Sequence, residues 1–441
     1  MLHCSTKCAA KVAARRRTVH LDPMTAKTLD KPLSEKPGFV EFVCLIALMM
    51  AINALAIDAM LPALPDIGDA LGVASANSRQ WVVTAYLLGF GAAQIVYGPL
   101  ADRYGRKPIL MFGVSVYVLF SVVAMLAPTF ETLILARIGQ GMGSAATRVL
   151  AVSIVRDRYS GRQMARVMSL SFLVFLGVPI LAPSIGQAIL LIAPWEGIFA
   201  AFAFAGIALL IWAGLRLPET LHVEDRLPIQ AGRILSAFRL VLTHRISMGY
   251  TLAMTAITAA LFGFINSAQQ IFFDVFDAPS LFAIVFAAIA GGMAVASILN
   301  ARLVEKLGSR LIGHSALLGF IAMASIHALV VASGHETIWT FAILQALTMF
   351  CFGLLAGNFG SMAMEPMGHI AGTASSVQGF VSTILGSLAG FAIGQAFDGT
   401  VQPLTIGFTL CGLTALACVL YAERGRLFVA QNRAPASAAA K

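Results

Sequence analysis

Twelve long apolar runs, separated by short charged or Pro/Gly-containing breaks, constrain this 441-residue chain more than any other feature. The first, FVCLIALMMAINALAIDAMLPAL, has the roughly 20 apolar residues that a helix needs to cross a hydrocarbon core of about 30 Å. Only 12% of the residues are charged, against about a quarter in a soluble domain. The sequence therefore predicts an all-α membrane protein with twelve transmembrane helices, at 39–62, 79–99, 107–127, 131–155, 167–191, 195–215, 246–272, 280–301, 311–333, 336–360, 373–397 and 402–422.

The positions of Lys and Arg predict the orientation of these helices. When the N-terminus is placed inside the cell, 27 of the 30 basic residues fall in the tails and loops on that side. The exceptions are Arg79, Arg137 and Arg148. The positive-inside rule therefore places both termini in the cytoplasm. Because topology accounts for the net charge of +9, we expect no nucleic-acid partner.

A short internal repeat divides the chain. Residues 100–107 (LADRYGRK) and 303–310 (LVEKLGSR) share Leu, an acid, a base, Gly and a final base, and both follow the second span of their half. The repeat predicts two pseudo-symmetric six-helix bundles. We expect a disordered basic tail at 1–38 (with Met1 or Met24 as the start), bundles at 39–215 and 246–423, a cytoplasmic linker at 216–245 and a tail at 424–441.

The first copy of the repeat, GPLADRYGRK, is a candidate cytoplasmic gate. Gly98 ends a helix with Pro99, and Gly105 permits a tight turn. Asp102 can pair with Arg106 or accept backbone N–H groups from a neighbouring helix. With Arg103, these residues could latch the two halves together; the alternative is a simple topology anchor.

Four segments resemble the major facilitator superfamily, and more narrowly its drug:H⁺ antiporters of the Bcr/CflA multidrug efflux type. They are GPLADRYGRKP, LAIDAMLPALPDI at 55–67, LARIGQGMGSAA with AVSIVRD within 135–157, and GVPILAPSIGQ at 177–187. The resemblance implies a monomeric transporter in a bacterial inner membrane that exports small amphipathic drugs or metabolites by alternating access. It would use the proton gradient and no cofactor.

The fifth span matches the motif associated with antiporters at four positions, Gly177, Pro179, Pro183 and Gly186. Its prolines interrupt the helical hydrogen bonds and predict a kink between the half-bundles. The match is incomplete, because Ala182 precedes Pro183 and Gln187 replaces a final glycine.

Charged groups inside a membrane are functional candidates, because their desolvation is costly. We expect Asp58, near the outer end of the first span, to exchange protons. Arg137 should lie at a similar depth, roughly 6–9 Å below the outer surface, and could tune Asp58. Burial favours the protonated carboxyl and a nearby guanidinium favours the charged one. The alternative is that Asp58 only caps the span before its prolines.

Further polar residues are predicted to line a substrate cavity. In the fourth span, helical spacing places Arg137, Gln140, Ser144 and Arg148 on one face. Arg148 could bind an anionic or dipolar group of the substrate, or a backbone carbonyl. Asn53, Asn266 and Gln270 are also candidates, although interhelical hydrogen bonding explains any one of them equally simply.

Two other functions are alternatives to drug export. A proton symporter importing a sugar or carboxylate would share the fold, and a non-transporting receptor would show no proton flux. The sequence has no nucleophile–base set, so we expect no enzyme. His327 is the one intramembrane histidine and has no helical His or carboxylate partner, so we expect no metal site.

Overall fold

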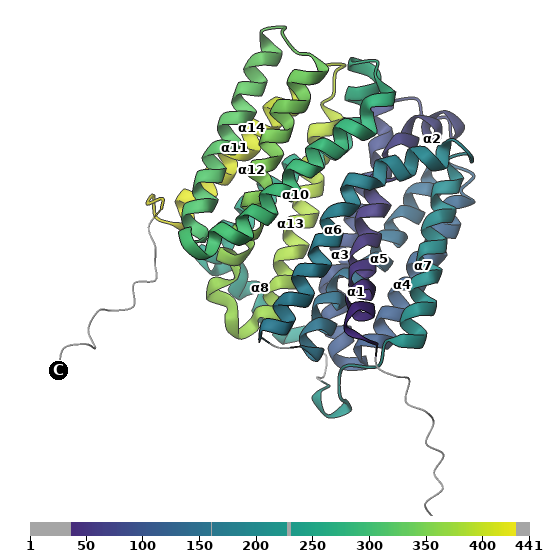
Figure 1. The fold of residues 1–441 in the computed structure, drawn as a ribbon, viewed down its shortest axis with the longest axis vertical. Helices are drawn as coiled ribbons and strands as arrows, with labels where there is room; N and C mark the ends of the chain where they lie inside the picture. Colours follow the sequence, from purple (N-terminus) through teal and green to yellow (C-terminus); the bar gives the residue numbers. More distant parts are fainter. Residues whose placement is uncertain (1–36, 160, 227–230, 429–441) are drawn as a thin grey trace, which may run out of the picture. The chain divides into compact units, whose positions relative to one another are not determined.

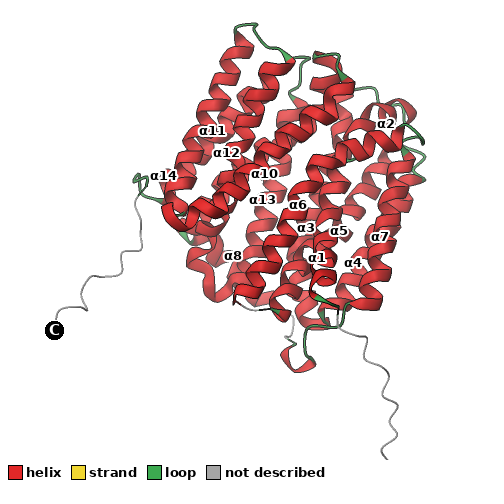
Figure 2. Cartoon of the chain, in the orientation of Figure 1, coloured by secondary structure: helices red, strands yellow, loops and turns green. Residues whose placement is uncertain are grey.

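A computed structural model describes residues 37–159, 161–226 and 231–428, and this part of the chain is helical with no strand (Figure 2). The predicted tails fall mostly outside it. Twelve helices of at least 20 residues are present in the described ranges: α1 (Phe39–Asp58), α3 (Trp81–Tyr104), α4 (Arg106–Met125), α5 (Phe130–Arg158), α6 (Gly161–Leu190), α7 (Glu196–Arg216), α9 (Arg245–Gln270), α10 (Phe282–Leu307), α11 (Ser309–Ala332), α12 (Ile338–Met364), α13 (Ala371–Gln395) and α14 (Gln402–Ala422).

Ten of these helices are long and apolar enough to cross a membrane. The other two are α5, which is less apolar because Arg137, Gln140 and Arg148 lie within it, and α6, of which the segment Leu176–Leu190 is apolar among the residues described in full. Both pack against α1 and therefore belong to the same layer of spans. The prediction of twelve spans is confirmed, with ends that differ by a few residues.

The two halves use the same packing pattern (Figure 1). In the first half, α1 contacts α5, α6 and α7, and α4 contacts α5 and α7. In the second half, α9 contacts α12, α13 and α14, and α11 contacts α12 and α14. Between the halves, α3 packs on α13 and α6 packs on α10. In the same comparison α3 corresponds to α10 and α6 corresponds to α13, so these two contacts are equivalent. The predicted pseudo-symmetry of two six-helix bundles is confirmed.

The sequence repeat corresponds to one repeated turn. Gly105 joins α3 to α4 with φ 106° and ψ 157°, and Gly308 joins α10 to α11 with φ 79° and ψ 153°. A side chain makes this backbone conformation strained, which explains the glycine in both copies. The turn therefore fixes the direction in which the third helix of each half leaves the second.

Short elements lie between the long helices. On the predicted outer side are η1 (Leu61–Ala63), α2 (Leu64–Ala70), η2 (Ala76–Gln80), the π-helical turn η4 (Ile271–Val275) and η5 (Pro279–Leu281). On the predicted cytoplasmic side are η3 (Val223–Asp225), α8 (Ala231–Thr243) and η6 (Glu365–Ile370). The linker therefore contains helix, and α8 packs on α13 through Phe238 and Phe380, whose ring centroids are 6.0 Å apart.

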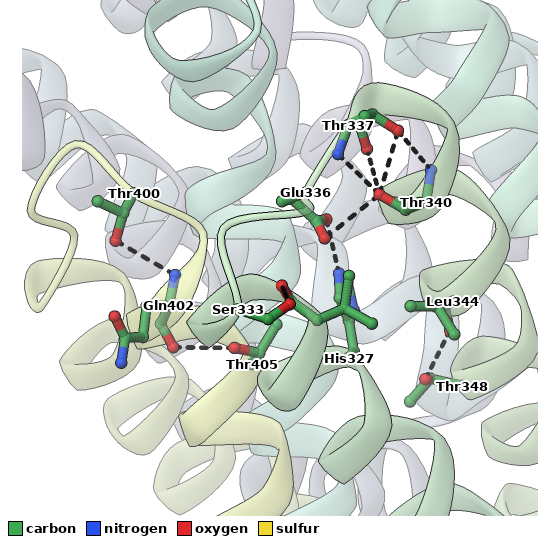
Figure 3. A network of polar contacts seen from close by, with 11 residues as sticks. His327, Ser333, Glu336, Thr337, Thr340, Leu344, Thr348, Thr400, Gln402 and Thr405 are labelled. Carbon is green, nitrogen blue, oxygen red and sulfur yellow. Dashed lines mark hydrogen bonds and ion pairs between the residues drawn. The ribbon is translucent and has the colours of Figure 1, made fainter.

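The α11–α12 hairpin holds a buried histidine–carboxylate hydrogen bond that helical spacing did not reveal. Figure 3 shows His327 and Glu336 pointing toward one another, with Nε2 2.9 Å from Oε1. Thr340 donates to the other carboxylate oxygen at 3.3 Å, and Thr337 caps α12. His327 thus has a carboxylate partner. The sequence analysis considered only partners at helical spacing, and Glu336 comes from the turn after α11, where that spacing does not apply.

Candidate functional site

Arg137 is fully buried and its donors are directed at main-chain carbonyls. Nε donates to Val82 O at 2.9 Å, and Nη2 donates to Ala56 O at 3.0 Å. Nη1 donates to Gln140 Oε1 at 2.5 Å, and the guanidinium carbon lies 4.5 Å from the ring centroid of Tyr86. These contacts tie α5 to α1 and α3. The carbonyl and amide dipoles at these contacts stabilise the buried positive charge of the guanidinium. A position that faced lipid would offer no such dipoles.

Asp58 ends α1 and is 4% exposed, and its Oδ1 has no hydrogen-bond partner among the described residues. No ion pair with Arg137 forms in the described structure. The guanidinium is directed at Ala56 O and Val82 O instead. A buried carboxylate oxygen without a partner is unusual and needs a specific explanation.

The helix with the predicted antiporter motif, α6, lies directly beside the end of α1. Gly186 of α6 approaches Ala59, the residue after Asp58, so closely that a side chain at 186 would overlap the Ala59 carbonyl oxygen. Pro179 and Pro183 lie inside α6, as expected. Gly177 differs from Gly186, because nothing lies within 4 Å of the position that its side chain would take.

Asn53, Gln140 and Ser144 are hydrogen bonded within the first half. The Tyr86 hydroxyl lies 3.0 Å from Asn53 Oδ1 and 2.7 Å from Ser144 Oγ and can donate its one proton to either, and Gln140 Nε2 donates to Ser121 Oγ at 2.7 Å. The polar face of α5 is therefore directed toward α1, α3 and α4 at these positions. The structure does not bring these three residues to a cavity lining, and sequence spacing gave no sign of Tyr86 as the common partner of Asn53 and Ser144.

Four amide side chains form what we call the outer amide seam: Asn77, Gln80, Gln270 and Gln395. Gln80 Nε2 donates to Gln270 Oε1 at 2.6 Å and to the carbonyl of Gly394 at 3.0 Å. Gln270 Nε2 donates to Asn77 Oδ1 at 2.7 Å, and Gln395 Nε2 donates to Asn77 O at 2.7 Å and Gln80 Oε1 at 3.2 Å. The seam joins η2 in the first half to α9 and α13 in the second.

Asn266 lies just inside the seam, where Thr84 donates to its Oδ1 at 3.4 Å. Asn266 and Gln270 share one face of α9, as the sequence predicts. In this conformation both are buried in contacts between the halves. The sequence analysis did not identify Asn77, Gln80 or Gln395.

The predicted cytoplasmic gate is an ion-pair cluster centred on Arg106. Nη1 of Arg106 lies 2.6 Å from Asp102 Oδ1, and Nε lies 3.0 Å from Asp157 Oδ2 at the end of α5. The Arg106 main-chain N–H donates to Glu219 Oε1 at 2.9 Å. Asp157 and Glu219 were not identified from the sequence. The cluster connects α3, α4, α5 and the linker, all on the side of the first half.

Two other residues of the predicted gate differ in their surroundings. Arg103 is exposed. Gly98 faces the second half, because a side chain there would lie 3.5 Å from Ser376 Oγ on α13. An analogous cluster occurs in the second half, where Arg310 lies 2.9 Å from Glu423 and 3.1 Å from Glu365.

Arg148 differs from Arg137, Gln140 and Ser144 of the same helix because it is exposed. It lies ten residues before the end of the helix, about 15 Å from that end at 1.5 Å per residue. Within the described residues, no group of three or more His, Cys, Asp or Glu side chains could hold a metal ion.

Comparison with known proteins agrees with this geometry. The profile described as "Major Facilitator Superfamily" matches residues 46–391. The chain is 31% identical to the uncharacterized MFS-type transporter YdgK of Bacillus subtilis over 85% of this chain and 93% of that protein. It is 27% identical to the bicyclomycin resistance protein homolog of Haemophilus influenzae over 88% of this chain and 96% of that protein. A structure of the xylose transporter XylE from E. coli in a partially occluded inward-open conformation superposes with a TM-score of 0.69 at 11% identity, covering 88% of this chain and 97% of that one.

Proposed function

Because this chain belongs to the major facilitator superfamily, we propose that it is a proton-coupled exporter of small amphipathic compounds. The relatives support this direction, since one is named a bicyclomycin resistance protein homolog. The chain is a multi-pass membrane protein of a transporter family and acts on small molecules. We place it, as a monomer, in a bacterial inner membrane with both termini in the cytoplasm, because the basic residues concentrate on that side.

The buried carboxyl of Asp58 carries the proposal. A carboxylate in an apolar site without a hydrogen-bond partner is strongly destabilised, whereas a neutral carboxyl is tolerated. Asp58 therefore fits this conformation best with a proton bound. When the outer end opens, water can reach the side chain and the charged form becomes stable. A proton taken up from the outside in that open state would neutralise the carboxyl and allow the outer end to close. Antiport then requires release of this proton to the cytoplasmic side before the outer end opens again.

The contacts between the halves support alternating access as the mechanism. At the outer end, the outer amide seam closes the halves against each other. At the cytoplasmic end, the ion pairs of Arg106 and of Arg310 stay within their own halves. The outer end is thus the more tightly joined, which is the arrangement expected of an inward-facing state.

Drug susceptibility in an efflux-deficient bacterial host tests the proposal. The parent protein should raise resistance to some compounds in a structurally varied panel, and Asp58→Asn should abolish that protection. For each compound, adding it to everted vesicles should dissipate an imposed proton gradient, measured with a pH-sensitive acridine dye, in the parent and not in Asp58→Asn.

Asp66→Asn is the matched control, since Asp66 is exposed in α2, eight residues after Asp58. It should behave as the parent does. Equal protection by the parent and Asp58→Asn would reject Asp58 as the coupling carboxyl. Protection against no compound would reject drug export itself.

A further inference from the structure

An accessible strip runs along the cytoplasmic part of α5. Arg148, Val152 and Arg156 are exposed, and their spacing of four residues places them on one face of the helix. On the outer side of Arg148, Ser144 and Ala145 are buried. The strip therefore begins near the cytoplasmic end of α5 and stops at Arg148, about 12 Å from Arg156 along the axis.

This strip faces the second half of the protein. A side chain at Gly372 of α13 would lie 3.7 Å from Nη1 of Arg156, so the lower end of the strip is directed at that helix. Protein surrounds Arg148 at longer range, although the side chain itself is exposed. A guanidinium exposed to lipid at this depth would be very costly. We infer that the strip lines a water-accessible space between the halves, open to the cytoplasm.

The two arginines of the first half inside the membrane have different surroundings. Arg137 is fully buried and is hydrogen bonded to Gln140 and to two main-chain carbonyls. Arg148 is exposed at the closed end of the accessible strip, with Arg156 nearer the opening. Two exposed positive charges along a path into a low-dielectric space attract anions from the cytoplasm.

We propose that Arg148 is the anion-recognition residue of the substrate site, and that the substrates are small amphipathic anions, such as aromatic carboxylates. This inference rests on the proposed export function for its biological meaning. The guanidinium can bind a carboxylate with two parallel N–H···O bonds, and the apolar body of the ligand would lie against neighbours such as Val152.

A binding measurement on the purified full-length protein in nanodiscs tests this assignment without a proton gradient. The probes are 9-anthracenecarboxylate, 9-anthracenecarboxamide and 9-anthracenemethylammonium, which share a fluorescent ring system and differ in charge. The parent should bind the carboxylate roughly tenfold more tightly than the other two, as expected for one charge-assisted hydrogen-bonded pair. Arg148→Gln should remove this preference, and Arg148→Lys should retain part of it.

Two further variants keep the test independent of the folding of Arg148→Gln. Val152→Glu places an acid one turn from Arg148 at an exposed position, and should weaken carboxylate binding selectively. Arg302→Gln removes an exposed arginine of the second half and should change nothing.

The inference is overturned if the parent shows no preference for the carboxylate. It is also overturned if Arg148→Gln weakens all three probes equally, because that pattern indicates a packing role. Since binding requires no gradient, a protein that binds the carboxylate through Arg148 and yet fails to export would contradict the proposed function alone.

Discussion

Removing the Gln80 side chain should release the outer end of the two halves. Gln80 is buried at the start of α3 and takes part in three hydrogen bonds to the second half, with Gln270, Gly394 and Gln395. Each bond contributes about 1 kcal/mol net, so Gln80→Ala should shift the balance between closed and open seam by up to ~3 kcal/mol. Water that reaches the freed amides offsets part of this free-energy change. The ratio of molecules with an open seam to those with a closed seam should then change roughly 10- to 100-fold.

Labelling of a cysteine placed just inside the seam measures that change. Thr84 is buried one turn below Gln80 and contacts Asn266, so Thr84→Cys is protected while the seam is closed. A membrane-impermeant maleimide added outside intact cells should label Thr84→Cys at least tenfold faster when Gln80→Ala is also present.

The control for this measurement is Gln345→Ala. Gln345 is also a buried amide, on α12, and it takes no part in the outer amide seam. It should leave the labelling rate of Thr84→Cys unchanged. If Gln80→Ala leaves the rate unchanged, or Gln345→Ala raises it equally, the seam does not hold the outer end closed.

Two further predictions concern stability. Arg106→Gln removes both ion pairs of a guanidinium that is 5% exposed, and should destabilise the purified protein by about 2 kcal/mol, seen as a lower melting temperature by differential scanning fluorimetry; an unchanged melting temperature would contradict this. Gly141→Val would drive a side chain into the main-chain carbonyl of Tyr86 and should abolish a monodisperse peak in size-exclusion chromatography. Gly177→Ala is its control, because the space beside Gly177 is open, and equal behaviour of the two variants would refute the packing argument.

The number and order of the membrane-spanning helices could be predicted from the sequence, because each span is determined by its own residues. An apolar run of about 20 residues determines a span whatever its neighbours do, and the paired glycines at 105 and 308 encode the same turn twice. The outer amide seam was not predictable in this way. Gln80 bonds to Gln270 and Gly394, which lie 190 and 314 positions away, and no local pattern relates them.

The site was predicted only in part, for a geometric reason. Counting residues from the end of a span gives depth, which placed Asp58 and Arg137 at similar levels. Depth does not give direction around the helix axis, and Arg137 is directed at Val82 O and Ala56 O. The same limit applied to Ser144, which shares a helix face with Arg148 in sequence spacing and yet is buried against Tyr86.

Asp58 and the outer amide seam lie at the same end of the protein, and this position suggests how a proton could control the conformation. The charged carboxylate needs water, and water enters from outside only when the seam is open. The neutral carboxyl is compatible with the dry environment of the closed state. The seam itself contains only amides, so it does not titrate and its strength is the same at every pH that the cell meets. Any dependence of the open–closed balance on pH must then come from another group, and our proposal assigns that role to Asp58, at the end of α1.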